Sequence, residues 1–177
     1  MDLPYYNIYI NTPIDGMHAF FLGVAKQFIS MWTSRKNENY FINESTIEAL
    51  DTAMLQTQLP SEFTRSQLQL RNIANWKYYD FYLWTSYFSV PILESVLPQE
   101  YFEHWSEFVD IMSIACSTRI TFGELSDLDS RCKVFQQRTA QLYKVYYKIS
   151  RFYIQYFQLE LNSRMRMLKS TCTSLGI

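Results

Sequence analysis

The sequence predicts a mainly α-helical protein: an irregular bundle of about five helices, in which apolar residues recur at spacings of three and four. The 177 residues contain only 4 Gly and 5 Pro, which argues against a turn-rich β fold. Hydrophobic residues make up 48% of the chain and aromatic residues 18%, far above a disordered composition. A chain of this length suits one domain and can bury a sizeable core.

The first helix is expected from about Gly16 to Ser34, with Pro13 and Asp15 marking its start. Before it, residues 4–14 are rich in Tyr, Ile and Asn but alternate poorly, so a short strand and an extended lead-in both stay open. The apolar positions of this helix follow helical spacing: Phe21, Val24, Ala25, Phe28 and Trp32.

A second helix is predicted over residues 46–57, because Ser45 and Glu48 have the spacing of a capping box. Pro60 ends that region. Residues 59–72 are polar and irregular, and no more than a single turn is expected there.

Residues 73–95 are the most aromatic stretch and predict a helix that is buried on several sides. Pro91 is expected to kink or divide it. One face is expected to carry Trp76, Tyr79, Leu83, Tyr87 and Val90.

Two further helices follow. Pro98 opens one, with Glu100 and Glu103 in the first turn, where the helix dipole favours acids. Thr121 and Glu124 form a second capping box, and the apolar spacing after it predicts a long helix of about six turns. The stripes on these two helices are Tyr101, Trp105, Phe108, Met112 and Cys116, and then Leu125, Leu128, Cys132, Phe135, Thr139, Leu142 and Tyr146.

Asp15 and His18 are the polar pair of most chemical interest, because they stand three residues apart at a helix start. The Asp15 carboxylate could cap the helix or reach the His18 imidazole, at an end where N–H groups favour anions. The alternative is an ordinary N-cap beside a satisfied histidine. No metal site is expected, because two ligands fall short of the three or four that zinc takes from protein.

The block Pro13-Ile14-Asp15-x-Met17-His18-x-x-x-Leu22-Gly23-x-Ala25-Lys26 resembles one found in CACTA-type (En/Spm) transposases. Further resemblances follow in the family's order and extend the match over roughly residues 3 to 143. They are Leu59-Pro60-Ser61-Glu62-Phe63, Trp76-Lys77, Val96-Leu97-Pro98 with Tyr101-Phe102 and His104-Trp105, and Gln141-Leu142-Tyr143.

The resemblance implies a helical insertion domain over residues 1–143, within a transposase whose catalytic core has the RNase H-like fold. Residues 144–177 are then a divergent basic aromatic helix and tail, as a truncated or frame-shifted gene copy would explain. The family cuts and joins DNA with carboxylates that hold Mg²⁺. None of these carboxylates can be placed here, so the chain is expected to need no cofactor and to lack catalysis on its own. Asp15 and His18 would lie near the family's active site.

Charge is unevenly distributed along the chain. Residues 1–130 hold 7 Lys/Arg and 16 Asp/Glu, a net charge of −9, whereas residues 131–177 hold 9 Lys/Arg and one acid, a net charge of +8. Lys144, Tyr147, Lys148 and Arg151 are candidate nucleic-acid contacts, since cations neutralise phosphates and rings stack on bases. The alternative is an amphipathic helix with a solvated basic face.

The remaining chemistry-bearing residues have plainer interpretations. His104 is expected to be a half-exposed helix histidine beside Glu100 and Glu107. Cys116 and Cys132 are expected to be small core residues. The odd cysteine count, the lack of a signal peptide and the lack of an apolar run of membrane length predict a nuclear or cytoplasmic protein that is neither secreted nor in a membrane.

These observations favour a transposon-derived fragment of a cut-and-paste DNA transposase without catalytic activity of its own. The alternatives are a non-catalytic helical DNA-binding module and a protein-interaction module built on the aromatic surface around Trp76–Phe88. The expected partners are DNA, the missing transposase core, or a second copy of the chain.

Overall fold

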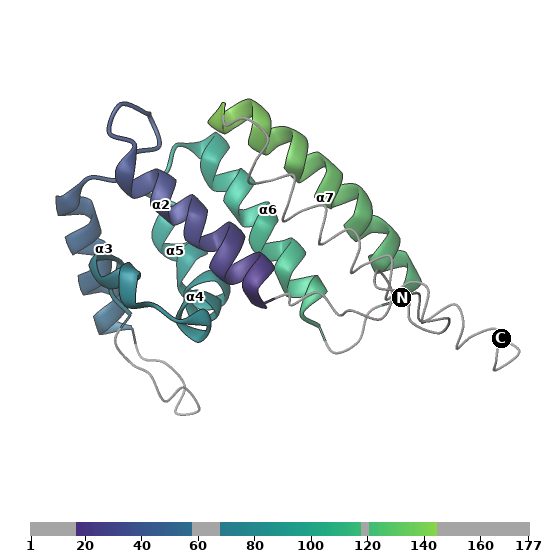
Figure 1. Ribbon diagram of the computed structural model, residues 1–177, viewed down its shortest axis with the longest axis horizontal. Helices are drawn as coiled ribbons and strands as arrows, with labels where there is room; N and C mark the ends of the chain where they lie inside the picture. The colour runs from purple at the N-terminus through teal and green to yellow at the C-terminus, as the bar shows by residue number, and fades with distance from the viewer. Residues whose placement is uncertain (1–16, 58–67, 118–120, 145–177) are drawn as a thin grey trace, which may run out of the picture. The chain divides into compact units, whose positions relative to one another are not determined.

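The computed structural model describes residues 17–57, 68–117 and 121–144, and within these ranges the chain is mainly helical and contains no strand (Figure 1). The predicted fold class is therefore confirmed. The N-terminal segment 4–14, for which a strand was one expectation, lies outside the described residues. Within the described ranges, no helix has the length and apolar character needed to cross a bilayer.

The elements belong to two compact units, one formed by Phe20–Val109 and the other by Met1–Ala19 together with Asp110–Ile177. The described residues end at Lys144, so the boundary expected between residues 143 and 144 stays a prediction. In chain order the elements are a π-helix η1 (Met17–Ala25), α2 (Lys26–Ser34), α3 (Glu44–Gln56), a 3₁₀-helix η2 (Leu70–Asn75), α4 (Tyr78–Leu83), a π-helix η3 (Trp84–Phe88), α5 (Ser89–Leu93), α6 (Gln99–Ala115) and α7 (Phe122–Tyr143).

The first helical stretch has the expected length, but its first half is a π-helix, η1, that continues into α2. The next helix, α3, begins two residues earlier than predicted. Its cap is Asn43, whose side chain accepts the Thr46 N–H at 2.9 Å, and not Ser45. Ser45 instead donates its hydroxyl to Asn43 Oδ1 at 2.7 Å, so the expected capping box is wrong.

The aromatic stretch is helical from Tyr78 to Leu93 but is not a regular α-helix throughout. It comprises α4, η3 and α5, and Pro91 lies inside α5, so the irregular π-helical turn comes before the proline. Proline lacks an N–H and its ring crowds the carbonyl four residues earlier, here that of Tyr87. The π-helical turn that holds Tyr87 therefore lies where this constraint acts.

The π-helical turn also changes which residues face the core. Phe81, Leu83, Trp84 and Phe88 are buried, whereas Tyr87, expected on the buried face, is 48% exposed. A π-helix has more residues per turn than the 3.6 used for the prediction, so positions beyond Leu83 rotate away from their expected directions.

The two later helices agree more closely with expectation. Pro98 directly precedes α6 and accepts the N–H groups of Tyr101 and Phe102 through its carbonyl. Before α7, Thr121 accepts the Glu124 N–H at 3.2 Å while the Glu124 carboxylate accepts the Thr121 N–H at 2.7 Å. The predicted capping box is therefore confirmed, and these bonds lower the pKa of Glu124. The buried face of α7 includes Leu128, Cys132, Phe135, Thr139 and Tyr143.

The core of the unit Phe20–Val109 is a continuous series of indole rings, the tryptophan series, which contains all four tryptophans of the chain. Trp105 of α6 lies between Trp32 of α2, with ring centroids 5.0 Å apart, and Trp84 of η3, at 5.5 Å. Trp84 in turn lies 6.2 Å from Trp76. All four rings are buried. These contacts hold α2, η3 and α6 together, and α2 and α6 run side by side in Figure 1.

We predict that Thr121→Ala destabilises the folded chain by about 1 kcal/mol, because it removes the hydroxyl that accepts the Glu124 N–H. The free energy of unfolding from urea denaturation measures this loss. Ser126→Ala, at an exposed position on the same helix, serves as the control and should leave stability unchanged or slightly raised. Equal losses in both variants would contradict a capping role for Thr121.

Candidate functional site

The residues predicted to carry function are only partly within the described ranges. Asp15 lies outside them, and His18 lies in the first turn of η1, where its backbone alone is described. Lys144 follows α7 with φ 48°, in the left-handed region, and is exposed. Tyr147, Lys148 and Arg151 lie outside the described residues. The roles of these six residues stay predictions.

His104 is buried, with 1% of its surface exposed, so the expectation of a half-exposed histidine is wrong. Its ring lies 5.6 Å from the Phe28 ring of α2. The cause is the width of the buried face of α6, which takes in His104 as well as Trp105 and Phe108. His104 is thus part of the aromatic core.

Cys116 and Cys132 differ in burial. Cys132 is buried on α7, as predicted, but Cys116 is exposed, so that expectation is wrong. Helix α6 ends at Ala115, one residue before Cys116, and the apolar stripe that predicted its burial ends there too.

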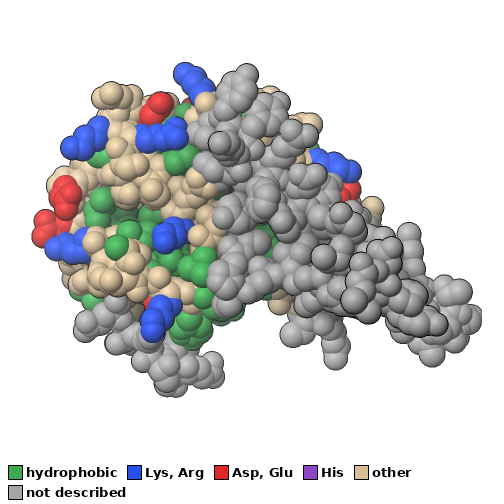
Figure 2. All heavy atoms as spheres, in the orientation of Figure 1, with side chains coloured by type: hydrophobic (Ala, Val, Ile, Leu, Met, Phe, Trp, Pro, Cys, Tyr) green, Lys and Arg blue, Asp and Glu red, His purple; other side chains and the backbone are tan. Residues whose placement is uncertain are grey.

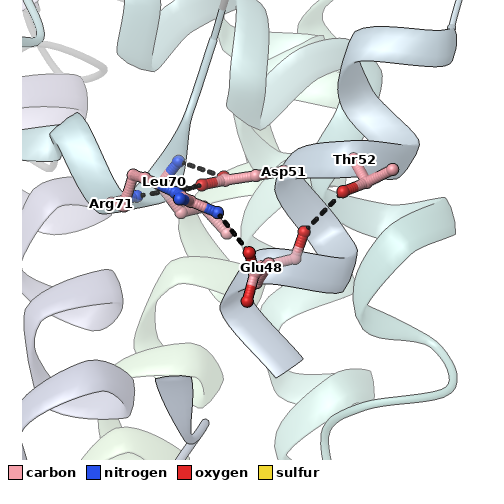
Figure 3. A network of polar contacts seen from close by, with 5 residues as sticks. All are labelled: Glu48, Asp51, Thr52, Leu70 and Arg71. Carbon is pink, nitrogen blue, oxygen red and sulfur yellow. Dashed lines mark hydrogen bonds and ion pairs between the residues drawn. The ribbon is translucent and has the colours of Figure 1, made fainter. Parts of the chain in front are cut away.

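A buried carboxylate not singled out by the sequence joins α3 to η2 (Figure 3). Asp51, 1% exposed, accepts the backbone N–H of Leu70 at 2.5 Å and the Nε–H of Arg71 at 2.9 Å. Arg71 Nη2 also lies 3.7 Å from Glu48 Oε1. The hydrogen bond to Asp51 raises the pKa of the Arg71 guanidinium. Because the carboxylate oxygens are occupied by these donors, this network is structural and offers no free acid or base.

A second buried polar contact fixes the tryptophan series. Trp105 donates its indole N–H to the Ser89 hydroxyl at 2.9 Å, and Ser89 donates to the Thr85 carbonyl at 2.8 Å. The indole N–H of Trp84 and the hydroxyl of Thr85 are also buried, and neither has a hydrogen-bond partner among the described residues. Polar atoms therefore gather along η3, the irregular part of this core.

Charge is segregated by element in the described structure. Helices α3 and α6 carry seven acids and no Lys or Arg: Glu44, Glu48 and Asp51, and Glu100, Glu103, Glu107 and Asp110. Residues 17–37 have the opposite character, with Lys26, Arg35, Lys36 and no acid. On the face drawn in Figure 2, Lys and Arg side chains surround hydrophobic ones over α2, and Asp and Glu show mainly at its edge.

Four tyrosine rings adjoin one another along α4 and η3. Tyr82 lies at their centre, with its ring centroid 6.3 Å from Tyr78, 6.2 Å from Tyr79 and 6.4 Å from Tyr87. Phe21 of η1 packs edge-on beneath two of them, 5.4 Å from Tyr78 and 5.5 Å from Tyr82. Tyr87 is exposed and the other three tyrosines are half-buried, whereas Phe21 is buried. This cluster is therefore the surface part of an otherwise buried aromatic segment.

The described residues contain no group of three His, Cys, Asp or Glu side chains placed to hold a metal ion. No family model, curated protein or solved structure matches the chain. The transposase resemblance therefore stays a prediction from the sequence.

We predict that Asp51→Ala destabilises the fold by about 2 to 3 kcal/mol, because it leaves the buried Leu70 N–H without an acceptor. Urea denaturation measures the loss. Thr52→Ala is the matched control on the same helix, since Thr52 is exposed and donates only to the Glu48 carbonyl of its own helix. A loss within about 0.5 kcal/mol for both variants would show that the network is dispensable.

Ser89→Ala should destabilise the core by about 1 to 3 kcal/mol, because the buried Trp105 N–H would be left without its acceptor. Thermal unfolding followed by tryptophan fluorescence reports the change. The neighbouring Ser86→Ala is the control, since Ser86 is exposed on η3. Equal melting temperatures for Ser89→Ala and the wild-type chain would rule out a stabilising role for this bond.

Proposed function

We propose that this chain is a non-catalytic helical module derived from a CACTA-type DNA transposase, and that it acts by binding. The observation that carries this proposal is that aromatic residues of the resembling blocks are core residues. Trp76, Tyr101, Trp105 and Tyr143 are all buried. Residues that build a core keep their spacing while surface residues diverge, which supports a common helical scaffold behind the resemblance.

Binding is a better description than catalysis because the buried polar groups serve the fold. Asp51 holds η2 to α3, and Ser89 holds the Trp105 indole. In this proposal the module makes no DNA cut itself, with or without Mg²⁺, and its contribution is to hold DNA or another part of the assembly.

DNA is the proposed ligand of the basic segment that begins at Lys144. Residues 144–177 hold 6 Lys/Arg and one acid, a net charge of +5, which supports this because cations near phosphates release counterions and make binding salt-dependent. In the proposal Lys148 and Arg151 add two further phosphate contacts and Tyr147 stacks on a base. The Asp15 and His18 pair is proposed to lie near the transposase active site in the complete assembly.

A protein-interaction module is the alternative. The tyrosines that stay accessible on α4 and η3 favour it, because tyrosine is enriched at protein interfaces. Most of the segment Trp76–Phe88 is buried, however, so this surface is much smaller than the sequence alone indicated.

Duplex DNA binding across a salt series tests the proposed function. We expect the variant Lys144→Gln/Lys148→Gln/Arg151→Gln to reduce the slope of log affinity against log salt by about three, because three phosphates are no longer neutralised. Lys133→Gln is the control, because exposed Lys133 already pairs with Asp129 at 2.7 Å. Salt-insensitive association into an oligomer, with no DNA binding by the folded chain, would favour the protein-interaction alternative.

A further inference from the structure

We propose that a tyrosine–lysine surface, formed by Tyr78, Tyr79, Tyr82, Tyr87, Lys26 and Lys77, binds single-stranded nucleic acid. This inference goes beyond the proposed function, because it concerns another part of the chain and unpaired strands. It rests on three features of the described structure: which rings are accessible, which charges surround them, and how firmly the rings are supported.

The rings are accessible and adjoining. Tyr87 is 48% exposed, and its ring centroid lies 6.4 Å from that of Tyr82, which continues the series to Tyr78 and Tyr79. Adjoining aromatic side chains offer successive stacking positions to unstacked bases, and this kind of interaction tolerates any base sequence. Bases inside a duplex are already stacked on one another, so single strands fit this surface better.

The charges around the rings are positive. Lys77 directly precedes Tyr78. Lys26 is the first residue of α2, five residues after the Phe21 that packs against Tyr78 and Tyr82. Both lysines are exposed, and neither forms an ion pair with a described carboxylate.

Asp80 is the only acid on the two short stretches of chain that carry these lysines, residues 17–37 and 68–93. Asp80 is buried and accepts the Lys77 backbone N–H at 2.8 Å, so it caps α4. The next exposed acids along the chain are Glu38 and Glu94, directly outside these stretches, so the local charge of residues 17–37 and 68–93 is positive.

The same charges argue against a second copy as the occupant, because an isologous interface would bring like-charged lysines together. An acidic peptide would satisfy the lysines, but its Asp and Glu side chains have no aromatic rings to stack on the tyrosines. A nucleic-acid strand satisfies both requirements.

The tyrosine rings are also held in place from the core side. Phe21 packs edge-on against Tyr78 and Tyr82 and limits the side-chain motion that a ligand would otherwise have to restrict on binding.

Fluorescence anisotropy tests the proposal with the full chain and a labelled oligothymidylate about 15 nucleotides long, at about 50 and 200 mM salt. We expect Tyr79→Ala/Tyr87→Ala to weaken binding about tenfold or more, because two stacking positions are removed. Tyr79→Phe/Tyr87→Phe keeps the rings and should bind like the wild-type chain. Lys26→Gln/Lys77→Gln should lower the salt slope by roughly 0.7 per lysine.

Leu55→Ala/Lys133→Gln is the matched control, since both positions are exposed on other helices. Circular dichroism confirms folding of each variant. Unchanged binding by the folded alanine and glutamine pairs would overturn the proposal. So would polyglutamate binding as tightly as the strand, or a dimer from which the strand is excluded. The variant Lys144→Gln/Lys148→Gln/Arg151→Gln, measured in parallel on duplex DNA, shows whether the proposed function fails independently.

Discussion

The Trp105 ring has neighbours on both sides, Trp32 of α2 and Trp84 of η3, and its one polar atom is bound to Ser89. An indole is large and rigid, and burying one contributes more when its N–H finds an acceptor, because an unsatisfied buried N–H costs about 1 to 3 kcal/mol. Helices α2, η3 and α6 must therefore take the positions that enclose this ring. The irregular π-helical turn is compatible with that requirement, because Thr85 lies in it and Ser89, which directly follows it in α5, joins the Thr85 carbonyl to the Trp105 N–H.

The surface of the unit Phe20–Val109 follows from how its core is built. The large rings of the aromatic segment lie inside, and the change of helical repeat at η3 leaves Tyr87 outside. Buried Asp51 pairs with Arg71 and buried Asp80 accepts a backbone N–H, so both carboxylates are used within the fold. Neither carboxylate is exposed for direct contact with a partner.

Local features of the fold could be predicted from the sequence and non-local ones could not. The Thr121–Glu124 capping box joins residues three apart, and its pattern was sufficient to predict it. The Asp51–Leu70 bond joins residues 19 apart, and no spacing rule identifies such a pair. The burial of His104 was missed because it depends on Phe28 of a neighbouring helix, and the exposure of Tyr87 because its π-helical turn has a repeat other than 3.6. Of the predicted site, only Lys144 and the backbone of His18 lie in the described residues.

The hydrogen bonds of Asp51 also bear on how long the connection between α3 and η2 can be. Its bonds to Leu70 and Arg71 fix both ends of the intervening segment, whatever that segment contains. The entropy of closing such a loop grows slowly, by about 0.6 kcal/mol for each doubling of its length. Insertions and deletions between α3 and η2 are therefore tolerated far better than changes at Asp51 itself, which makes this connection the natural place for related chains to vary in length.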